Sequence, residues 1–429
     1  MEEIELHPLQ QKAVDECCNV DNRVVATTGA AGTGKTTIIK RVYNQFKENG
    51  YTPVLCAPTG KAAKRIYEAT GIPALTIHRP LEYSHPGDPD PRTGKPCGIS
   101  APRRDSQNPI EFDVVLADEY AMVPYELHRN LFNALPRGGV IRMFGDDNQL
   151  APVEEDKSME GKPSPFRTIL DDRSGKFIVI VLEQVFRQGK DSGILSNCSN
   201  ILTGRYPVKN DQWSIEYTEA SVQALQDYIY AQDDEGHDFR SLENQIIVPQ
   251  NKSKVGTVAL NTMIQGMFHN YSEPYMRVDR HSWVKGEDGE DGSKIRMFEG
   301  DKVICTANMY DLMVFNGETG KIIELNMETG EIVIDFGDRE QVFPPVVMVQ
   351  NRHGTLSQID PRKSLDLAYA ITTHKSQGSE YKRGVYIINN SNAYMLSRRN
   401  FYTAASRFKE HLHLIANQKG LAIAMSKKG

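Results

Sequence analysis

Eight consecutive residues have the types and the spacing of a phosphate-binding loop. Residues 29–36 read Gly-Ala-Ala-Gly-Thr-Gly-Lys-Thr and satisfy the pattern G-x-x-x-x-G-K-[ST]. In such a loop the glycines let backbone N–H groups turn toward an anion, Lys35 reaches the outer phosphates of a nucleotide, and Thr36 ligates Mg²⁺. The pattern therefore predicts a site for a nucleoside triphosphate with Mg²⁺. Its expected binding residues are Gly29, Gly32, Thr33, Gly34, Lys35, Thr36 and Thr37.

Two further polar clusters supply the chemistry that hydrolysis of such a nucleotide needs. Asp118 can hold Mg²⁺ through water, and Glu119 can orient and deprotonate the attacking water. Gln149, at the end of the segment Gly-Asp-Asp-Asn-Gln, can sense the γ-phosphate. Acidic pairs and Gly-Asp turns are also common on protein surfaces. The position of each cluster directly after an apolar run favours the catalytic interpretation.

Two arginines are candidates for stabilising the charge that develops during phosphoryl transfer. Arg187 follows an apolar run that ends at Leu182, and Arg407 precedes the apolar run 412–415. A guanidinium group offers a bidentate geometry that an ammonium group cannot match. A surface salt bridge would explain either arginine equally well, so the residue type alone does not decide.

Short apolar runs alternate with helical patterns and predict the elements that position these groups. Residues 24–26 form a β-type run before the glycine loop, and apolar side chains recur at helical spacing after it. Further runs cover residues 54–57, 114–117 and 140–144. They predict buried parallel strands of a doubly wound α/β sheet, beyond whose carboxyl ends a ligand binds. A second set predicts a second sheet without a phosphate loop and covers residues 178–181, 246–248, 385–388 and 412–415.

Two segments interrupt this alternation. Residues 80–109 are crowded with proline and glycine, which predicts an inserted excursion from the first sheet. Residues 261–361 change to strand alternation, clearest at 321–326 and 331–336 on either side of a turn. This pattern predicts a small antiparallel β-barrel inserted in the second domain. Within it, the acidic and glycine-rich segment 285–293 predicts a loop.

Composition limits the classes of protein that remain. The 429 residues carry a formal charge of −6, so a nucleic-acid partner has to be argued from local sites rather than from the total charge. The six cysteines have no metal-ligand spacing, which argues against a zinc or iron–sulfur site. No apolar run reaches the roughly 18 residues of a membrane span. We therefore expect a protein of the cytoplasm, close to the nucleoid, or of the host-cell cytoplasm if it is encoded by a phage.

The chain resembles the RecD-like group of superfamily 1B DNA helicases, in order and across nearly its whole length. The segments that carry the resemblance are 6–10 (the adenine-reading Q motif, with Gln10), 29–36 (motif I), 57–63 (Ia), 76–78 (the next short signature), 118–119 (II), 145–153 (III), 182–188 (IV), 303–320 (the lead-in to the group's β-barrel), 368–379 (V) and 402–407 (VI). A single match of this kind could be an accident, whereas the ordered series could not.

The resemblance implies an α/β fold with two tandem RecA-like domains, a small inserted pin and an inserted antiparallel β-barrel. The implied boundaries are 1–79 and 110–183 for the first domain, 80–109 for the pin, 184–260 and 362–429 for the second domain, and 261–361 for the barrel. ATP would bind between the two domains. The implied catalytic residues are Lys35, Glu119, Gln149, Arg187 and Arg407, with Thr36 and Asp118 for Mg²⁺ and Gln10 for the adenine.

The resemblance also implies a track for single-stranded DNA across both domains. The implied contacts are Pro58, Thr59, His78, Thr373, His374 and Lys375. Tyr83 or His85 is the implied wedge of the pin, although an ordinary surface loop explains this segment nearly as well. A histidine that completes a core or caps a helix is the alternative for His78 and His374.

The implied function is an ATP hydrolase that works as a DNA helicase or translocase. It would travel 5′ to 3′ as a monomer, act at junctions of single- and double-stranded DNA, and have partners among replication or recombination proteins. The alternative is a nucleic-acid-stimulated ATPase that remodels RNA or nucleoprotein without processive unwinding. A nucleotide kinase is disfavoured, because such an enzyme needs neither Gln149 nor the segment 374–378.

Overall fold

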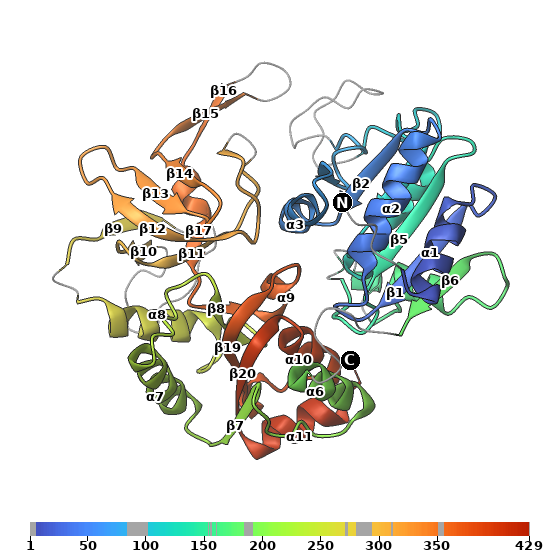
Figure 1. Cartoon of the computed structure of the whole chain (residues 1–429). Helices are drawn as coiled ribbons and strands as arrows, with labels where there is room; N and C mark the ends of the chain where they lie inside the picture. Colours follow the sequence, from blue (N-terminus) through green and yellow to red (C-terminus); the bar gives the residue numbers. More distant parts are fainter. Residues whose placement is uncertain are drawn as a thin grey trace. The chain divides into compact units, whose positions relative to one another are not determined.

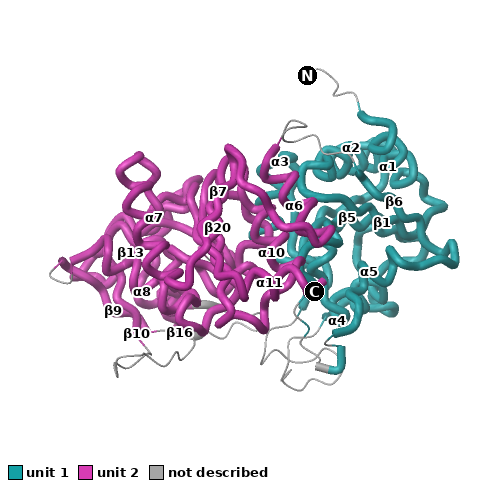
Figure 2. The backbone as a smooth tube through the Cα atoms, turned by 90° about the horizontal axis from the view of Figure 1, so that it is seen from below, with its two compact units in different colours: residues 1–191 teal, residues 192–429 magenta. Residues whose placement is uncertain are grey.

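A computed structural model gives the architecture of the chain. It describes residues 6–83, 102–152, 154, 157–159, 161–183, 192–270, 273–279, 294–309, 312–350 and 356–428. The chain divides into two compact units, residues 1–191 and residues 192–429 (Figure 2).

The first unit is built on a parallel sheet with the strand order β3-β2-β4-β5-β1-β6 (Figure 1). The strands are β1 (Val24–Gly29), β2 (Pro53–Ala57), β3 (Ala74–Thr76), β4 (Val114–Ala117), β5 (Val140–Gly145) and β6 (Ile178–Leu182). The helices of its described residues are α1 (Pro8–Cys18), α2 (Lys35–Glu48), α3 (Gly60–Thr70), α4 (Tyr125–Asn133) and α5 (Pro165–Leu170), with the 3₁₀ turns η1 (Tyr120–Met122) and η2 (Lys157–Met159).

Helices cover both faces of this sheet because its strands are apolar on both sides. Val14 of α1 and Ile38 of α2 are buried in one core cluster with strand residues such as Leu116. Leu131 of α4 and Phe166 of α5 belong to a second cluster, which packs on the other strand residues. This burial pattern is the doubly wound arrangement that the apolar runs predict.

One predicted run lies in a different sheet from the one expected. The apolar runs assigned residues 178–181 to the second sheet, whereas the boundary implied by the resemblance, 110–183, included them in the first domain. The structure agrees with the boundary, because β6 pairs in parallel with β1, with Val25 opposite Ile178 and Gly29 opposite Leu182. The assignment was wrong because an apolar run records burial and not the identity of the neighbouring strand. The consequence is local: a Cβ atom on Gly29 would lie 2.9 Å from Leu182 Cβ, so the phosphate loop starts against β6.

The second unit contains another parallel sheet, in the order β18-β8-β19-β20-β7. The strands are β7 (Trp213–Tyr217), β8 (Asn244–Val248), β18 (Ala370–Thr372), β19 (Tyr381–Ile388) and β20 (Phe408–Ala416). The helices of its described residues are α6 (Gly193–Thr203), α7 (Ser221–Asp234), α8 (Thr257–Phe268), α9 (Thr373–Ser376), α10 (Arg398–Ala405) and α11 (Gln418–Ser426), with the 3₁₀ turn η5 (Asn390–Asn392).

Antiparallel strands are inserted between β8 and β18, and residues 273–367 are called the inserted β region below. Its main sheet has the order β14-β13-β12-β11-β17, and β9-β10 and β15-β16 form separate antiparallel pairs. The strands are β9 (Met276–Asp279), β10 (Lys294–Met297), β11 (Lys302–Cys305), β12 (Thr319–Leu325), β13 (Ile332–Asp335), β14 (Glu340–Phe343), β15 (Val347–Gln350), β16 (Leu356–Ile359) and β17 (Leu365–Leu367), with the 3₁₀ turn η4 (Pro361–Ser364).

Two parallel sheets with an antiparallel insertion confirm the predicted fold class, and the β12-β13 pair confirms the predicted hairpin. The predicted loop 285–293 and most of the predicted pin, residues 84–101, lie outside the described residues. No helix in the described part of the chain is both long enough and apolar enough to cross a membrane.

Candidate nucleotide and nucleic-acid site

The topology of the first sheet brings three polar clusters together at one edge. Strands β4, β5 and β1 are neighbours and run parallel, with Ala117 opposite Met143 and Thr28 opposite Gly145. The loop after β1, the pair after β4 and the segment after β5 therefore all begin at the carboxyl edge of the sheet. This is the edge at which parallel α/β sheets bind their ligands.

The loop between β1 and α2 has the backbone that a phosphate cradle requires. Gly32 and Gly34 have φ angles of 84° and 86°, in the left-handed region that side chains with a Cβ atom avoid. Lys35 follows at the start of α2, and its Nζ donates to the carbonyl oxygens of Gly29 at 2.6 Å and Ala30 at 3.0 Å. The ammonium group therefore lies over the loop, where a phosphate can replace the carbonyl oxygens as its partner.

Gln10 is tied to the phosphate loop through its amide nitrogen and to the start of α1 through its amide oxygen. Its Nε2 donates to the Thr33 carbonyl oxygen at 3.1 Å, and its Oε1 accepts from the His7 backbone N–H at 3.0 Å. A Cβ atom on Gly34 would lie 2.2 Å from Gln10 Nε2, so glycine is needed there for space as well as for backbone conformation. Gln10 thus joins the start of α1 to the loop.

Asp118 and Glu119 lie at the end of β4 in an environment suited to a cation. Burial and the adjacent Glu119 charge raise the pKa of Asp118 to about 6, whereas the charge of Lys35 lowers it. The Asp118 Oδ1 accepts from the Glu119 backbone N–H at 2.8 Å. A buried carboxylate with a second carboxylate beside it favours a bound Mg²⁺. This ion binds through one or two protein oxygens together with substrate phosphates. The Asp118 carboxylate and the Thr36 hydroxyl, which follow β4 and the phosphate loop at the same edge of the sheet, supply oxygens of that kind.

Gln149 is buried beside the same edge, with 5% of its surface exposed. Its Oε1 has no hydrogen-bond partner within the described ranges. A buried amide oxygen without a partner is costly, and a water molecule or ligand normally satisfies it. This orphaned acceptor is consistent with the expected sensing of a nucleotide or its attacking water.

Arg407 of the second unit is a buried residue and not part of a surface salt bridge. Only 3% of its surface is exposed. Its Nε donates to the Thr403 carbonyl oxygen at 3.0 Å, and its Nη2 donates to the Ser406 Oγ at 3.1 Å. These contacts position the guanidinium group between α10 and β20. Arg187, the other predicted arginine, lies outside the described residues.

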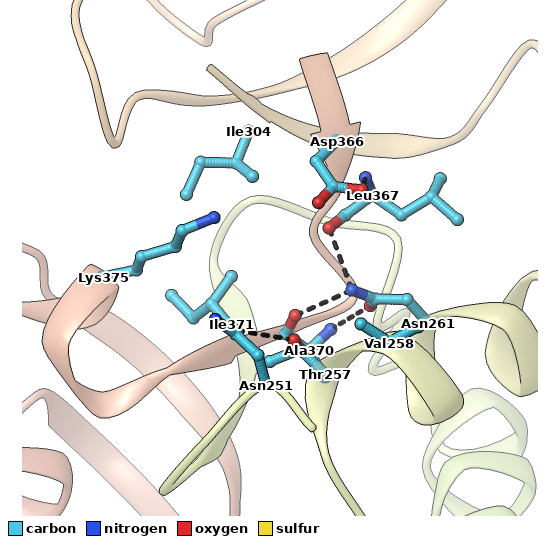
Figure 3. Close-up of a pocket in the computed structure, with 10 residues that line it drawn as sticks. All are labelled: Asn251, Thr257, Val258, Asn261, Ile304, Asp366, Leu367, Ala370, Ile371 and Lys375. Carbon is cyan, nitrogen blue, oxygen red and sulfur yellow. Dashed lines mark hydrogen bonds between the residues drawn. The ribbon is translucent and has the colours of Figure 1, made fainter. Parts of the chain in front are cut away.

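Residues 373–375 lie in the short helix α9, directly after β18. Thr373 is fully buried, and its Oγ1 donates to Asn400 Oδ1 at 2.8 Å, so its side chain supports the helix and does not face a DNA strand. Burial lowers the pKa of His374, which is therefore neutral at physiological pH. Lys375 lines a small cavity that also contains Asp366 (Figure 3).

Comparison with known proteins identifies the family. Two family models match, an AAA domain at residues 5–217 and a UvrD-like helicase C-terminal domain at residues 367–415. The ATP-dependent RecD2 DNA helicase of Deinococcus radiodurans is 27% identical over 416 residues, which are 95% of this chain and 49% of that protein. The RecBCD enzyme subunit RecD of Mycobacterium tuberculosis is 24% identical, with 94% and 68% covered. The chain belongs to the superfamily 1 helicases of the RecD/Pif1 type.

Solved structures of this family share the fold of the chain. Bacteroides Pif1 bound to single-stranded DNA gives a TM-score of 0.60 at 20% identity, with 96% of this chain and 92% of that one covered. Pif1 helicase from Candida albicans gives 0.57 at 18% identity, with 99% and 100% covered. The resemblance inferred from the ordered motifs is confirmed. The chain spans about half the length of its Deinococcus relative.

In this RecD/Pif1-type chain, the residues of the first unit that are predicted to contact DNA differ from one another in their surroundings. Thr59 is the N-cap of α3, and its Oγ1 accepts from the Ala62 backbone N–H at 3.2 Å. Pro58 precedes it at the end of β2.

The exposed His78 ring packs edge-on against Tyr83, with ring centroids 4.8 Å apart. The Tyr83 hydroxyl accepts from Asn130 Nδ2 of α4 at 2.9 Å, so this candidate wedge is anchored to the folded unit. His85 lies outside the described residues.

Sequence patterns missed a fully buried arginine that holds the connection between α1 and β1. Arg142 of β5 donates through Nη2 to the Asn19 carbonyl oxygen at 2.9 Å and through Nη1 to the Asn22 carbonyl oxygen at 2.7 Å. These carbonyl groups follow the last turn of α1, the helix that carries Gln10. Burial lowers the pKa of Arg142 to about 10. Nothing in the local sequence signals this role, because the partners are more than a hundred residues away.

Proposed function

We propose that the chain is an ATP-dependent DNA helicase that moves 5′ to 3′ along single-stranded DNA. The observation that carries the proposal is the gathering of the phosphate loop, Asp118, Glu119 and Gln149 at one edge of a parallel sheet, in a chain of the RecD/Pif1 type. The relatives named above include a protein described as an ATP-dependent DNA helicase and a Pif1 bound to single-stranded DNA. Both support the proposal.

In the proposed reaction, Glu119 accepts a proton from the water that attacks the γ-phosphate. Lys35 exchanges the carbonyl oxygens of its own loop for phosphate oxygens, and Thr36 and Asp118 hold Mg²⁺. When bound, Mg²⁺ neutralises charge on the phosphate oxygens. Gln149 donates its amide hydrogens to the γ-phosphate side of the site or holds the attacking water with its unpaired oxygen.

Arg187 and Arg407 are the proposed source of positive charge for the transition state. Phosphoryl transfer spreads negative charge over the equatorial oxygens, which a guanidinium group binds in a bidentate manner. Binding of the nucleotide would favour one arrangement of the two units and hydrolysis another, because only differential affinity can shift such an equilibrium. Alternating grip on DNA by the segments around Thr59 and His374 would convert this cycle into travel.

The proposed DNA contacts suit binding without sequence preference. Backbone N–H groups, hydroxyl groups and a neutral His374 contact sugars and phosphates, which carry no base information. Lys375 would provide the charge that makes binding dependent on salt. Junctions of single- and double-stranded DNA are the proposed substrates, and Tyr83 is the proposed wedge residue.

Strand displacement on tailed duplexes tests the proposed function. We expect ATP-dependent unwinding of a duplex with a 5′ single-stranded tail and none with a 3′ tail. Unwinding only from the 3′ tail would overturn the polarity. ATPase rates measured without polymer, with single-stranded DNA and with RNA distinguish the alternatives: stimulation by RNA alone would favour an RNA remodelling enzyme, and no stimulation would exclude a motor.

A further inference from the structure

A single stretch of backbone joins the inserted β region to the proposed DNA contacts. Strand β17 ends at Leu367, β18 begins at Ala370, and α9 with His374 and Lys375 follows directly. We call residues 367–370 the crossover. The chain enters the inserted β region after α8 and leaves it through these four residues, so the crossover is the connection that leads directly to α9.

Asn261 of α8 binds the crossover with every polar atom of its amide. Its Oδ1 accepts from the Ala370 backbone N–H at 2.7 Å, and its Nδ2 donates to the carbonyl oxygens of Ala370 at 3.0 Å and Leu367 at 2.9 Å (Figure 3). In the part of the chain that the structure describes, β18 is the last strand of its sheet. Asn261 thus pairs with Ala370 as a further strand would, using one side chain.

The same helix also binds the inserted β region, one turn further on. Gln265 Nε2 donates to Asp301 Oδ2 at 2.6 Å, and the Tyr369 hydroxyl of the crossover donates to Asp301 Oδ1 at 2.6 Å. Asp301 is fully buried at the start of β11 and also accepts from the Phe298 backbone N–H at 2.8 Å. Helix α8, the crossover and the inserted β region therefore share one buried hydrogen-bond network.

Gln245 of β8 holds the crossover from the sheet side. Its Nε2 donates to the carbonyl oxygens of Ala368 at 3.0 Å and Tyr369 at 2.9 Å, and the Ala368 backbone N–H donates to the Lys302 carbonyl oxygen at 2.7 Å. Apolar packing alone would bury this segment, as one core cluster runs from Val385 of β19 through Leu260 of α8 to Val303 of β11. Apolar contacts are non-directional, whereas hydrogen bonds define the position of each backbone group.

We propose that Asn261 is a positioning residue that makes the inserted β region and the DNA-contacting helix α9 move as one body. The inference rests on the proposed function for its consequence, which is efficient conversion of ATP hydrolysis into strand separation. Asn261 contacts neither the phosphate loop nor the carboxylates of the first unit, so its loss should leave ATP hydrolysis itself intact. Misplacement of α9 by a fraction of an ångström would instead waste hydrolysis cycles.

The chain offers a matched control for the stability cost of the substitution. Asn197 of α6 is fully buried and pairs its amide with one backbone unit in the same way, donating to the Val208 carbonyl oxygen at 2.8 Å and accepting from the Val208 N–H at 2.9 Å. It belongs to the same unit but does not contact the crossover. Asn261→Ala and Asn197→Ala should therefore lower the melting temperature by similar amounts.

The test compares duplexes unwound per ATP hydrolysed in the full chain. We expect Asn261→Ala to lower this ratio about tenfold, with the maximal DNA-stimulated ATPase rate within about twofold of the unsubstituted protein, and Asn197→Ala to leave the ratio unchanged. Gln265→Leu should lower the ratio in the same direction, and the double variant Asn261→Ala/Gln265→Leu should be no worse than the stronger single one. Equal effects of Asn261→Ala and Asn197→Ala on the ratio would overturn the proposal.

Hydrogen exchange separates failure of this inference from failure of the proposed function. Asn261→Ala should speed exchange of the backbone amides of residues 370–376 while leaving those of β20 unchanged, whatever the protein does to DNA. Unchanged exchange in 370–376 overturns the positioning role. If the unsubstituted protein unwinds no duplex, the proposed function fails, and the exchange result still decides whether Asn261 holds the crossover.

Discussion

At the scale of single residues, Glu119 combines a strained backbone with the position of a general base. Its φ angle is 50°, in the left-handed region that costs a residue with a Cβ atom about 1–2 kcal/mol. The hydrogen bond from its N–H to Asp118 holds this conformation. Strain of this kind persists where the surrounding structure requires it, and here it lies between two adjacent carboxylates for which we propose different roles.

We therefore expect Glu119→Gln to keep nucleotide and DNA binding and to lower the maximal ATPase rate by about 10²–10⁴-fold, because the amide cannot accept the proton of the attacking water. Steady-state ATPase assays and equilibrium binding of a labelled nucleotide measure the two effects. Glu126→Gln, at an exposed glutamate in the first turn of α4, is the matched control. Undiminished hydrolysis by the Glu119 variant would remove this residue as the base.

At the scale of elements, helix α4 supports the turn that carries Glu119. His128 Nδ1 of α4 lies 3.0 Å from the hydroxyl of Tyr120, the residue after Glu119. Burial lowers the pKa of His128 to about 4, so the ring that shares this hydrogen bond is neutral. An unfolded histidine titrates near pH 6.5. The contribution of His128 to stability is thus complete above about pH 6.5 and is lost as the pH falls toward 4.

The predicted consequence is a loss of stability in acid that His128→Gln should reduce. The pKa difference corresponds to at most about 3 kcal/mol at pH 4. Urea unfolding of the full chain at a series of pH values between 7.5 and 4.5 measures it, and the variant should show a smaller slope. His413 of the second unit, whose pKa burial also lowers to about 4, supplies a residual slope in both proteins. Identical slopes would show that His128 does not titrate in this range.

Between elements, the parallel order of the strands converts separate sequence motifs into one site. Motif positions after β1, β4 and β5 are far apart in the chain but adjacent in the sheet, since these strands are neighbours. Arg142 adds a contact that this order alone does not provide, as it binds the carbonyl groups after α1 and so fixes the C-terminal end of that helix to β5. Side-chain contacts of this kind adjust what the strand order has brought together.

At the scale of the whole molecule, the described residues of the inserted β region share one apolar core with the parallel sheet of the second unit. Its buried residues Ile322 and Ile332 belong to the same cluster as Ile246 and Val385 of the parallel sheet. Cooperative unfolding units follow contiguous buried contacts. An insertion with its own core would open alone, whereas this one shares its buried surface with the sheet that carries α9.

Native-state hydrogen exchange in increasing denaturant should therefore give one opening free energy for the slowest amides of β11, β12, β8 and β19. The expectation concerns the second unit alone and needs no ligand. Amides of the first unit serve as the internal reference, because their strands belong to other clusters. Earlier opening of β11 and β12 than of β8 and β19 would contradict the shared core.

Local sequence patterns were sufficient wherever the chemistry is made by consecutive residues. The phosphate loop could be recognised because its glycines, Lys35 and Thr36 act within one turn of backbone. The strands before Asp118 and Gln149 could be predicted from their apolar runs. The ordered motifs then indicated the RecD-like group of helicases, and the comparisons with known proteins support the RecD/Pif1 type. Short-range geometry is determined by the residues that form it, so such features can be read without coordinates.

Only the tertiary structure decided the contacts between distant segments. It paired residues 178–182 with β1, showed that Thr373 is buried, and brought Arg142 to the end of α1 and Asn261 to the crossover. An apolar run states that a strand is buried but not which strand lies beside it. An asparagine or a glutamine in a helix likewise carries no sign of its partner, because one amide can pair with any backbone group that folding brings within about 3 Å.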